Sequence, residues 1–339
     1  MEQESILQLH PGLIIGFGIT VVFMLLLDLG VFNKKTHIIS SKEATIWSII
    51  WISLSMVFSG VVYYIFNQDA GGHALAIEKF TQFQAAYWIE KALSVDNLFV
   101  FILVFSFFKV PRELHHKVLF YGIIGALIMR AVFIFAGVEI INLTYLPAFE
   151  LFGKSVQINV VMTLFGLFLV YAGIKSWGGG DDDEDEDFSN TAGAKLVKKL
   201  YKVSDNYDKD KFFTVQNGIK MATPLLVVVA VIEFTDVLFA VDSIPAIFAI
   251  SKDPFILYTS NIFAILGLRS LYFLLSNFIY MFSKLPYGLA FILSFIGVKM
   301  VISPWVHISS PVSLGVVGGI LVISVIASLM FPEKKEEVA

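Results

Sequence analysis

The sequence predicts an all-α polytopic membrane protein with about nine transmembrane helices, an inverted three-helix repeat, an outside N-terminus and a cytoplasmic C-terminus. The 339 residues are 57% hydrophobic and only 15% charged, with a mean hydropathy of +0.79. This composition is far more apolar than a water-soluble surface permits. Apolar runs of membrane-spanning length recur along the chain, and basic residues gather in every second loop. We therefore expect a single membrane domain over residues 1–339 with the lipid bilayer as its partner.

Nine apolar segments are long enough to cross about 30 Å of hydrocarbon, which takes roughly 20 helical residues. They run from Leu13 to Phe32, Ala44 to Phe66, Phe83 to Phe108, Val118 to Val138, Val156 to Trp177, Thr223 to Ile250, Phe255 to Tyr280, Leu285 to Val306, and Val312 to Phe331. The first segment follows an acidic N-terminus with no basic region and no small-residue cleavage site, so we expect it to be retained as a span.

The distribution of Lys and Arg predicts the orientation. With the N-terminus outside, 17 of the 24 basic residues fall in cytoplasmic loops, and only Lys79, Lys154 and Lys252 fall in the opposite loops. The positive-inside rule predicts this bias for a multi-pass protein of the cytoplasmic (inner) membrane. Residues 178–220 then form a cytoplasmic linker with seven consecutive acids. Its basic amphipathic stretch from Lys195 to Tyr201 fits a lipid-bound helix and an ordinary surface helix equally well.

Composition also excludes several kinds of function. The net charge of -4 and the scattered basic residues argue against nucleic acid as a partner. The chain has no cysteine, which excludes disulfides, thiolate metal sites and cysteine nucleophiles. No prosthetic group is expected, and the oligomeric state stays open.

Two parts of the chain repeat one polar pattern. Residues 90–97 (EKALSVDN) align without a gap with residues 236–243 (DVLFAVDS) as acid, two residues, large apolar, small, Val, Asp, and amide or hydroxyl. Downstream, Arg130 parallels Arg269 and Gly173 parallels Gly297. The two units, 83–177 and 223–306, are offset by three spans, so they cross the membrane in opposite directions. Inverted repeats of this kind are typical of transporters that hold their substrate near the midplane.

Ionisable residues inside spans are candidates for the functional site, because a charge at a helix centre costs roughly 2.5 to 3.5 kcal/mol on insertion scales. The predicted metal ligands are Glu90, Asp96, Asn97, Glu233, Asp236 and Asp242. The predicted supporting residues are Asp28, Ser94, Ser243, Lys91, Arg130, Arg269 and Lys299. We expect Arg130 and Arg269 to pair with nearby acids, with Asp96 and Asp242 as candidates, and Lys299 to extend toward the membrane surface.

Helical periodicity places Glu90, Ser94 and Asn97 on one face of the third span, and Glu233 and Asp236 on one face of the sixth. Asp96 and Asp242 fall roughly 120° away from these faces. They either serve the arginines or reach the site through a local break, which Pro245 would supply; a simple kink at Pro245 is the alternative.

The donor types in these spans predict the ligand. Carboxylate, amide and hydroxyl oxygens, without cysteine or histidine deep in the spans, suit Mg²⁺, Ca²⁺ or Mn²⁺. Crowded, desolvated carboxylates retain a proton when the site is empty, so we expect metal entry to displace protons and to couple transport to proton counterflow.

The segments Glu90 to Asn97 and Glu233 to Ala246 resemble the two signature segments of the TerC family of bacterial integral membrane proteins. The likeness extends over nearly the whole chain apart from the linker. The family is named for tellurite resistance, its members are described as manganese exporters, and it is grouped with the LysE superfamily. The resemblance therefore implies export of cytoplasmic Mn²⁺, whereas the residues alone indicate only a hard divalent cation.

Two other functions remain as alternatives to a transporter that is not an enzyme. The paired aspartates would serve an intramembrane aspartyl hydrolase, although no second aspartyl motif has the expected neighbours. A non-transporting membrane scaffold would use the same charges only to hold its helices together.

Overall fold

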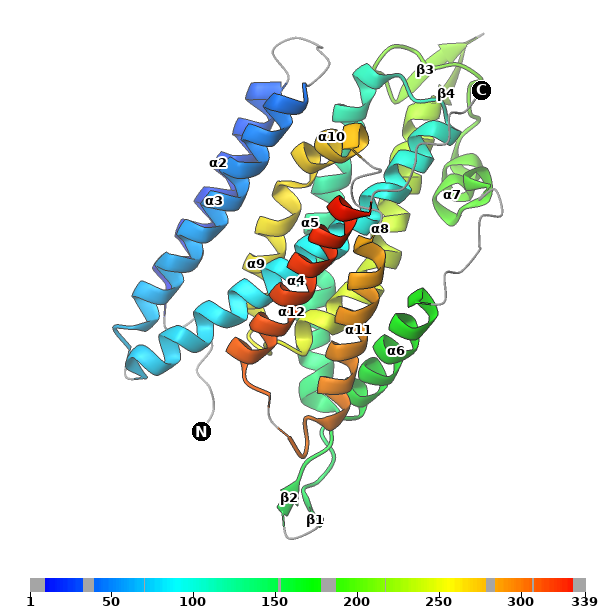
Figure 1. The fold of residues 1–339 in the computed structure, drawn as a ribbon. Coiled ribbons are helices and arrows are strands. Elements are labelled where there is room, and N and C mark those ends of the chain that lie inside the picture. The colour runs from blue at the N-terminus through cyan, green and yellow to red at the C-terminus, as the bar shows by residue number, and fades with distance from the viewer. Residues whose placement is uncertain are drawn as a thin grey trace.

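The chain folds into a bundle of tilted helices with a short β hairpin at each end (Figure 1). The computed structural model describes residues 10–32, 40–69, 71–151, 154–177, 187–216, 218–278, 284–306 and 308–331. The helices are α2 (Pro11–Phe32), α3 (Ser41–Phe66), α4 (Gly72–Phe107), α5 (Arg112–Leu143), α6 (Val160–Trp177), α7 (Ala192–Leu200), α8 (Pro224–Phe248), α9 (Pro254–Leu266), α10 (Leu268–Phe278), α11 (Leu285–Ile302) and α12 (Ser310–Met330), with a 3-10 turn η1 (Phe188–Asn190). The strands are β1 (Phe149–Leu151), β2 (Lys154–Val156), β3 (Phe213–Gln216) and β4 (Ile219–Ala222).

Each of the nine predicted spans corresponds to helix, but fewer have the length and apolarity of a membrane span. Six described helices do, and seven when α9 and α10 count as one span that bends by 40°. The other two are α2, whose described apolar part is shorter (Pro11–Leu27), and α4, which carries several charged residues. The chain is thus a multi-pass helical membrane protein, while the count of nine and the orientation of the termini stay predictions.

The two hairpins depart from the all-α prediction. β1 pairs antiparallel with β2, and β3 pairs antiparallel with β4. Val156 therefore belongs to a strand, and the helix predicted from that residue begins at Val160. In the second hairpin Gly218 has a φ of +76°, a left-handed conformation that glycine adopts without steric cost. Apolar content alone does not distinguish a short strand from the first turn of a span.

The interruption of a membrane helix also lies in a different place from the one predicted. α8 continues through Pro245 to Phe248, although this proline has no N–H to donate to the carbonyl of Val241. The break occurs instead in the seventh span, where α9 ends at Leu266 and α10 begins at Leu268. Arg269 therefore lies directly after the break in a discontinuous span.

The described part of the linker packs beside α8. The predicted amphipathic helix is present as α7, which buries Gly193, Ala194 and Val197. A Cβ on Gly193 would lie 2.2 Å from the carbonyl oxygen of Ala230, so the two helices meet backbone to backbone. The acidic residues 181–186 lie outside the described residues.

α6 and α11 approach each other closely because glycines lie at their contact. A Cβ on Gly166 would lie 2.9 Å from the carbonyl oxygen of Gly297, and a Cβ on Gly297 would lie 2.6 Å from that of Gly166. Two turns away, a Cβ on Gly173 would lie 2.7 Å from the carbonyl oxygen of Ala290. Small residues at such a contact let helix backbones approach, which is a main source of helix association in membranes.

Four helices enclose the centre of the bundle. α4 packs against α8 and α9, and α5 packs against the same two helices. α4 and α8 run in opposite directions through the bundle, while α2 and α3 lie to one side (Figure 1). The centre is therefore reached by side chains from both units of the predicted repeat.

We predict that Gly297→Ala destabilises the protein by about 1 to 3 kcal/mol, because its methyl group has no room between α6 and α11. Gly319→Ala on α12 is the matched control, since nothing lies within 4 Å of the added atom. The control should be neutral or slightly stabilising. Thermal unfolding of the two variants in detergent compares them, and equal melting temperatures would contradict the described contact.

Candidate functional site: a buried arginine between two acids

A cluster of buried charged side chains lies where α4, α5, α8 and α9 meet. Arg130 on α5 is 1% exposed, Glu90 on α4 is 0% exposed, and Asp236 on α8 is 8% exposed. The Nη1 atom of Arg130 donates to Oε1 of Glu90, and its Nη2 atom donates to Oδ1 of Asp236 at 3.4 Å. One guanidinium therefore joins acids from two oppositely directed helices.

Oxygen atoms from three helices converge on Nη1 of Arg130. Besides Oε1 of Glu90, Oδ1 of Asn261 on α9 lies 3.3 Å from this nitrogen and Oγ of Ser243 on α8 lies 3.5 Å from it. Ser94 adds a hydrogen bond of 3.4 Å to the same Glu90 oxygen. A carboxylate, an amide and a hydroxyl thus surround a single positively charged atom.

Several atoms of this cluster have no hydrogen-bond partner among the described side chains. They are Oε2 of Glu90, Oδ2 of Asp236, Nε of Arg130 and Nδ2 of Asn261. Buried polar atoms without partners are rare in proteins, and each costs roughly 1 to 3 kcal/mol. Two carboxylate oxygens are therefore available to a further cation or hydrogen-bond donor.

A third acid, Glu233, lies one turn of α8 away from Asp236. It lies three residues before Asp236 and on the same side of the helix. Its carboxylate lies against α5, where a Cβ on Gly125 would fall 1.7 Å from Oε2 of Glu233. The absence of a side chain at Gly125 therefore leaves the space that this carboxylate occupies.

Lys91 follows Glu90 on α4 but contacts the break between α9 and α10. Its Nζ atom donates to the carbonyl oxygen of Ala264 at 3.2 Å, and a Cβ on Gly267 would lie 2.8 Å from that nitrogen. An uninterrupted helix would satisfy this carbonyl through the amide four residues later. Lys91 thus supplies a donor where the membrane helix is interrupted.

The structure brings together part of the predicted site. Glu90, Asp236, Ser243 and Arg130 form one network, and Ser94 adjoins it. Asn97 is buried on α4 and Glu233 is half-buried on α8, without a hydrogen bond to Arg130. Lys299 lies elsewhere and bonds Ser313 near the β1–β2 end, while Arg269 is buried at the start of α10.

The structure describes acidic partners of Arg130 and leaves the other predicted pairs open. Arg130 pairs with Glu90 and Asp236, because the helices dock with these faces toward α5. The side chains of Asp28, Asp96 and Asp242 lie outside the described residues, so their predicted roles, including a pair between Arg269 and Asp242, stay predictions. Lys299 is only 7% exposed and bonds Ser313, and its predicted extension toward the membrane surface stays a prediction.

Sequence analysis did not identify Asn261 as a site residue. This side chain is 1% exposed in α9, and its position in an otherwise apolar span was the available signal. Within the described ranges, no group of three or more His, Cys, Asp or Glu side chains could hold a metal ion. The set around Arg130 combines two acids with an amide and a hydroxyl, and such oxygen ligands suit Mg²⁺, Ca²⁺ and Mn²⁺.

We predict that Arg130→Met destabilises the protein by about 3 to 5 kcal/mol, because it leaves Glu90 and Asp236 buried and unpaired. The double variant Arg130→Met/Glu90→Gln should lose less than the sum of the single variants. Arg112→Met, at the exposed start of the same helix, is the matched control and should change little. Thermal unfolding in detergent compares the wild type with Arg130→Met, Glu90→Gln, the double variant and Arg112→Met. An Arg130→Met variant as stable as the control variant would contradict the ion-pair network.

Comparison with known proteins agrees with the membrane fold. Residues 75–336 match the model of the integral membrane protein TerC family. The chain is 42% identical over 320 residues to an uncharacterised membrane protein of Myxococcus xanthus, covering 94% of this chain and 92% of the relative. It is 42% identical over 315 residues to the "Putative membrane-bound redox modulator Alx" of Escherichia coli K12, with 92% of both chains covered. No solved structure matches the chain. This protein therefore belongs to the integral membrane protein TerC family.

Proposed function

We propose that this chain exports divalent metal cations, manganese in the first place, from the cytoplasm by alternating access at the Arg130 cluster. The observation that carries the proposal is the convergence of Glu90, Ser243 and Asn261 oxygens on one nitrogen of Arg130. A site that holds a guanidinium nitrogen among oxygens has the charge and the donor atoms that a hard cation requires. Arg130 is then an internal cation that occupies the site between transport events.

Charge supports a divalent substrate. Glu90, Asp236 and the neighbouring Glu233 outnumber Arg130, the one base in hydrogen-bond contact with these acids in the described part of the chain. Oε2 of Glu90 and Oδ2 of Asp236 are already without partners. An entering metal would take these oxygens first and then compete with the guanidinium for the others. Manganese as the cargo and export as the direction rest on the resemblance to described TerC exporters.

The helix arrangement supports alternating access. In the aligned repeat, Gly173 is equivalent to Gly297, and Gly166 is equivalent to Ala290. The observed contacts pair Gly166 with Gly297 and Gly173 with Ala290, so exchanging equivalent residues turns one contact into the other. Such local two-fold symmetry is expected of two inverted units that rock against each other. The membrane in question is proposed to be the inner membrane of a bacterium.

The name of the Alx relatives suggests redox modulation as a second function. Thiol–disulfide exchange is not available to this chain, because its sequence has no cysteine. Export of a redox-active metal would change redox state indirectly, through the metal concentration. We therefore propose a transporter and not an enzyme, and place any redox effect downstream of transport.

We predict that Glu90→Gln and Asp236→Asn each slow manganese entry into reconstituted vesicles at least about tenfold, because each removes a charged ligand. Quenching of a manganese-sensitive dye trapped inside the vesicles measures the initial rate. Glu150→Gln, on the exposed strand β1, is the matched control and should transport normally. Equal quenching by the wild type and all variants, at equal protein incorporation, would leave a membrane scaffold as the better explanation. Peptide cleavage that Asp96→Asn abolishes, with metal flux unchanged, would instead favour a hydrolase.

We further predict that transport responds to a pH gradient, because crowded carboxylates must release protons when a divalent ion binds. Metal entry should be faster when the vesicle lumen is more acidic than the medium, since protons then leave as metal enters. Dye quenching with and without a protonophore provides the comparison. Manganese flux that is insensitive to the imposed gradient would remove proton coupling from the proposal and leave metal transport itself intact.

A further inference from the structure

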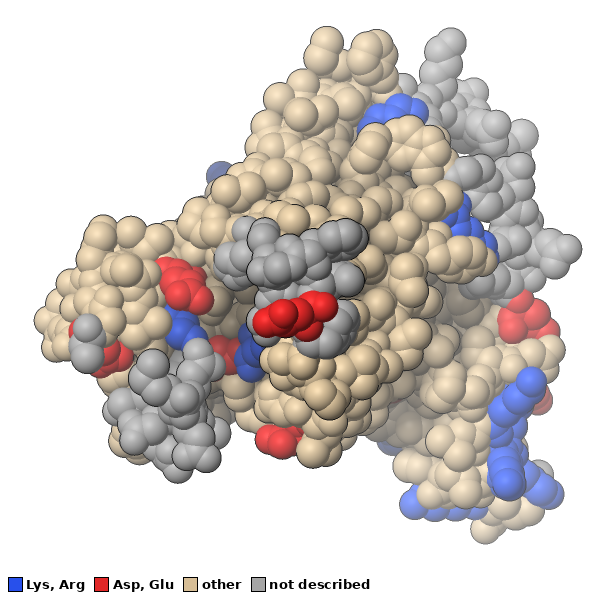
Figure 2. Space-filling view, turned by 90° about the horizontal axis from the view of Figure 1, so that it is seen from below, with Lys and Arg blue, Asp and Glu red and all other residues tan. Residues whose placement is uncertain are grey.

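A polar cavity of about 630 Å³ lies at the β1–β2 end of the bundle. Its lining comes from α4, α6, α11, the segment after α8 and the first residues of α12. Figure 2 shows this end of the molecule, where most of the visible surface is uncharged and the charged residues form separate small groups. The net charge of the cavity therefore depends on the few ionisable side chains that line it.

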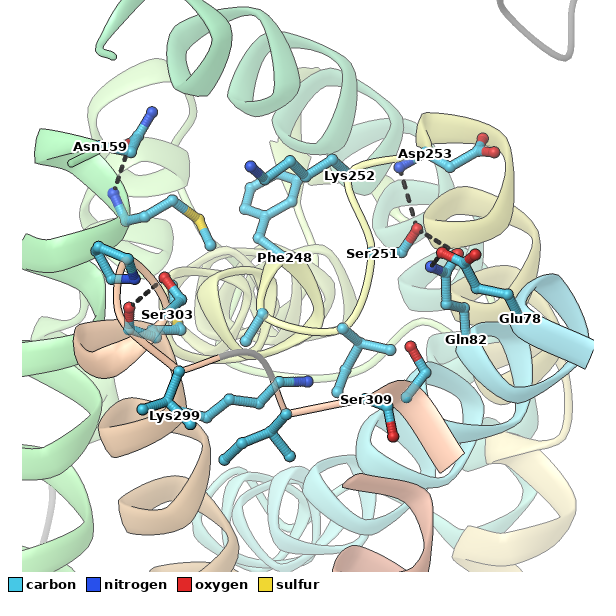
Figure 3. A pocket seen from close by; sticks show the side chains of 18 of the residues that line it. Glu78, Gln82, Asn159, Phe248, Ser251, Lys252, Asp253, Lys299, Ser303 and Ser309 are labelled. Carbon is cyan, nitrogen blue, oxygen red and sulfur yellow. Dashed lines mark hydrogen bonds between the residues drawn. The ribbon is translucent and has the colours of Figure 1, made fainter. Parts of the chain in front are cut away.

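Of the two acids that line the cavity, Asp253 has a charged partner and Glu78 has a neutral one. Asp253 accepts a hydrogen bond from Nζ of Lys79 at 2.6 Å and caps α9 by accepting one from the amide of Phe255 at 3.1 Å. Glu78 accepts a hydrogen bond from the side-chain amide of Gln82 at 3.0 Å. Figure 3 shows both carboxylates at one edge of the cavity, away from the amines of Lys252 and Lys299.

Among the described side chains, the hydrogen-bond partners of these two lysines are neutral. Nζ of Lys299, a residue 7% exposed, donates to Oγ of Ser313 at 2.8 Å. Lys252 contacts the hydroxyl of Tyr145, and its Nζ lies 4.7 Å from the centre of that ring. Among the described side chains, no carboxylate lies within ion-pair distance of either amine. Lys252 is exposed to solvent at the cavity, and the partial desolvation that remains lowers its pKa.

The start of α12 adds positive potential to the same cavity. Ser309, the N-cap residue of this 21-residue helix, lines the cavity together with Ser310 and Pro311. The Ser309 side chain makes no capping hydrogen bond, so it does not satisfy the first amides of the helix. Pro311 in this first turn has no N–H, so the helix dipole and the remaining amides of the turn are what favour an anion here.

We infer that this cavity binds a small oxyanion of the phosphate class, held by Lys252, Lys299 and the first turn of α12. An anion there would supply a counter-charge to the buried Lys299 and to the exposed Lys252, and would accept hydrogen bonds at the start of α12. Free phosphate and the phosphate of a lipid headgroup share this chemistry. A metal cation is disfavoured at the same place by the two lysines. The site is thus separate in position and charge from the Arg130 cluster.

The test uses the full chain in nanodiscs of neutral phosphatidylcholine, with equilibrium binding of radiolabelled inorganic phosphate. The wild type should bind phosphate saturably, and Lys252→Gln and Lys299→Gln should each weaken binding about tenfold. Lys299→Arg keeps the charge and should restore binding. Lys195→Gln, on exposed α7, is the matched control and should bind like the wild type.

A second arm identifies the source of the anion. Nanodiscs that contain anionic phosphatidylglycerol should weaken phosphate binding by competition if a lipid headgroup occupies the cavity, and should leave it unchanged if the ligand is free phosphate. Either result supports the site. The inference is overturned if the wild type shows no saturable binding, or if Lys252→Gln and Lys299→Gln both bind like the wild type. Neither outcome depends on metal transport, so this inference and the proposed function can fail separately.

Discussion

The guanidinium of Arg130 holds together two acids that would otherwise repel each other in the interior of the bundle. Glu90 and Asp236 come from helices that run in opposite directions, and neither has another basic partner among the described side chains. An uncompensated charge in such a place costs several kcal/mol, so the arginine fixes how α4, α5 and α8 dock. This network is a weak source of net stability but a strong source of specificity for one arrangement of the helices.

The surrounding fold is built to accommodate charge and close contact. Gly125 leaves room for the Glu233 carboxylate, and glycines let α6 and α11 touch through their backbones. The break between α9 and α10 raises a different requirement, because the helix hydrogen bonds are interrupted there and main-chain groups inside the bundle need other partners. Lys91 donates to the Ala264 carbonyl at this break. Irregular backbone at membrane depth is tolerated only where protein or a water-filled cavity covers it, and here a lysine from α4 provides part of that cover.

Much of this organisation could be predicted from the sequence, because membrane solvent imposes long apolar helices. The end of α3 at Phe66 was predicted to the residue, since polar residues follow it, and α6 is described up to Trp177, the predicted end of its span. α4 begins at Gly72 and not at Phe83, because hydropathy measures apolar length and does not detect a helix that continues into polar sequence. The acids of the site were recognisable as costly groups in spans, but their partners were not. Whether Arg130 meets Glu90 or Asp96 depends on how α4 is rotated against α5, and periodicity within one helix does not contain that information.

Under the proposed function, a metal ion and Arg130 share one set of oxygens, so each limits the binding of the other. Arginine keeps its charge in proteins, so it cannot leave the site by losing a proton and must move to other acceptors. α4 and α8 each carry a further aspartate six residues beyond the site acid, Asp96 and Asp242, roughly 9 Å along the helix. A guanidinium that moved toward these acids would change how α5 sits against its neighbours. A ligand shifts a conformational equilibrium only by its difference in affinity for the two states. Competition with the Arg130 guanidinium creates this difference in affinity, because the metal binds more tightly to the state in which the guanidinium has moved away from the shared oxygens.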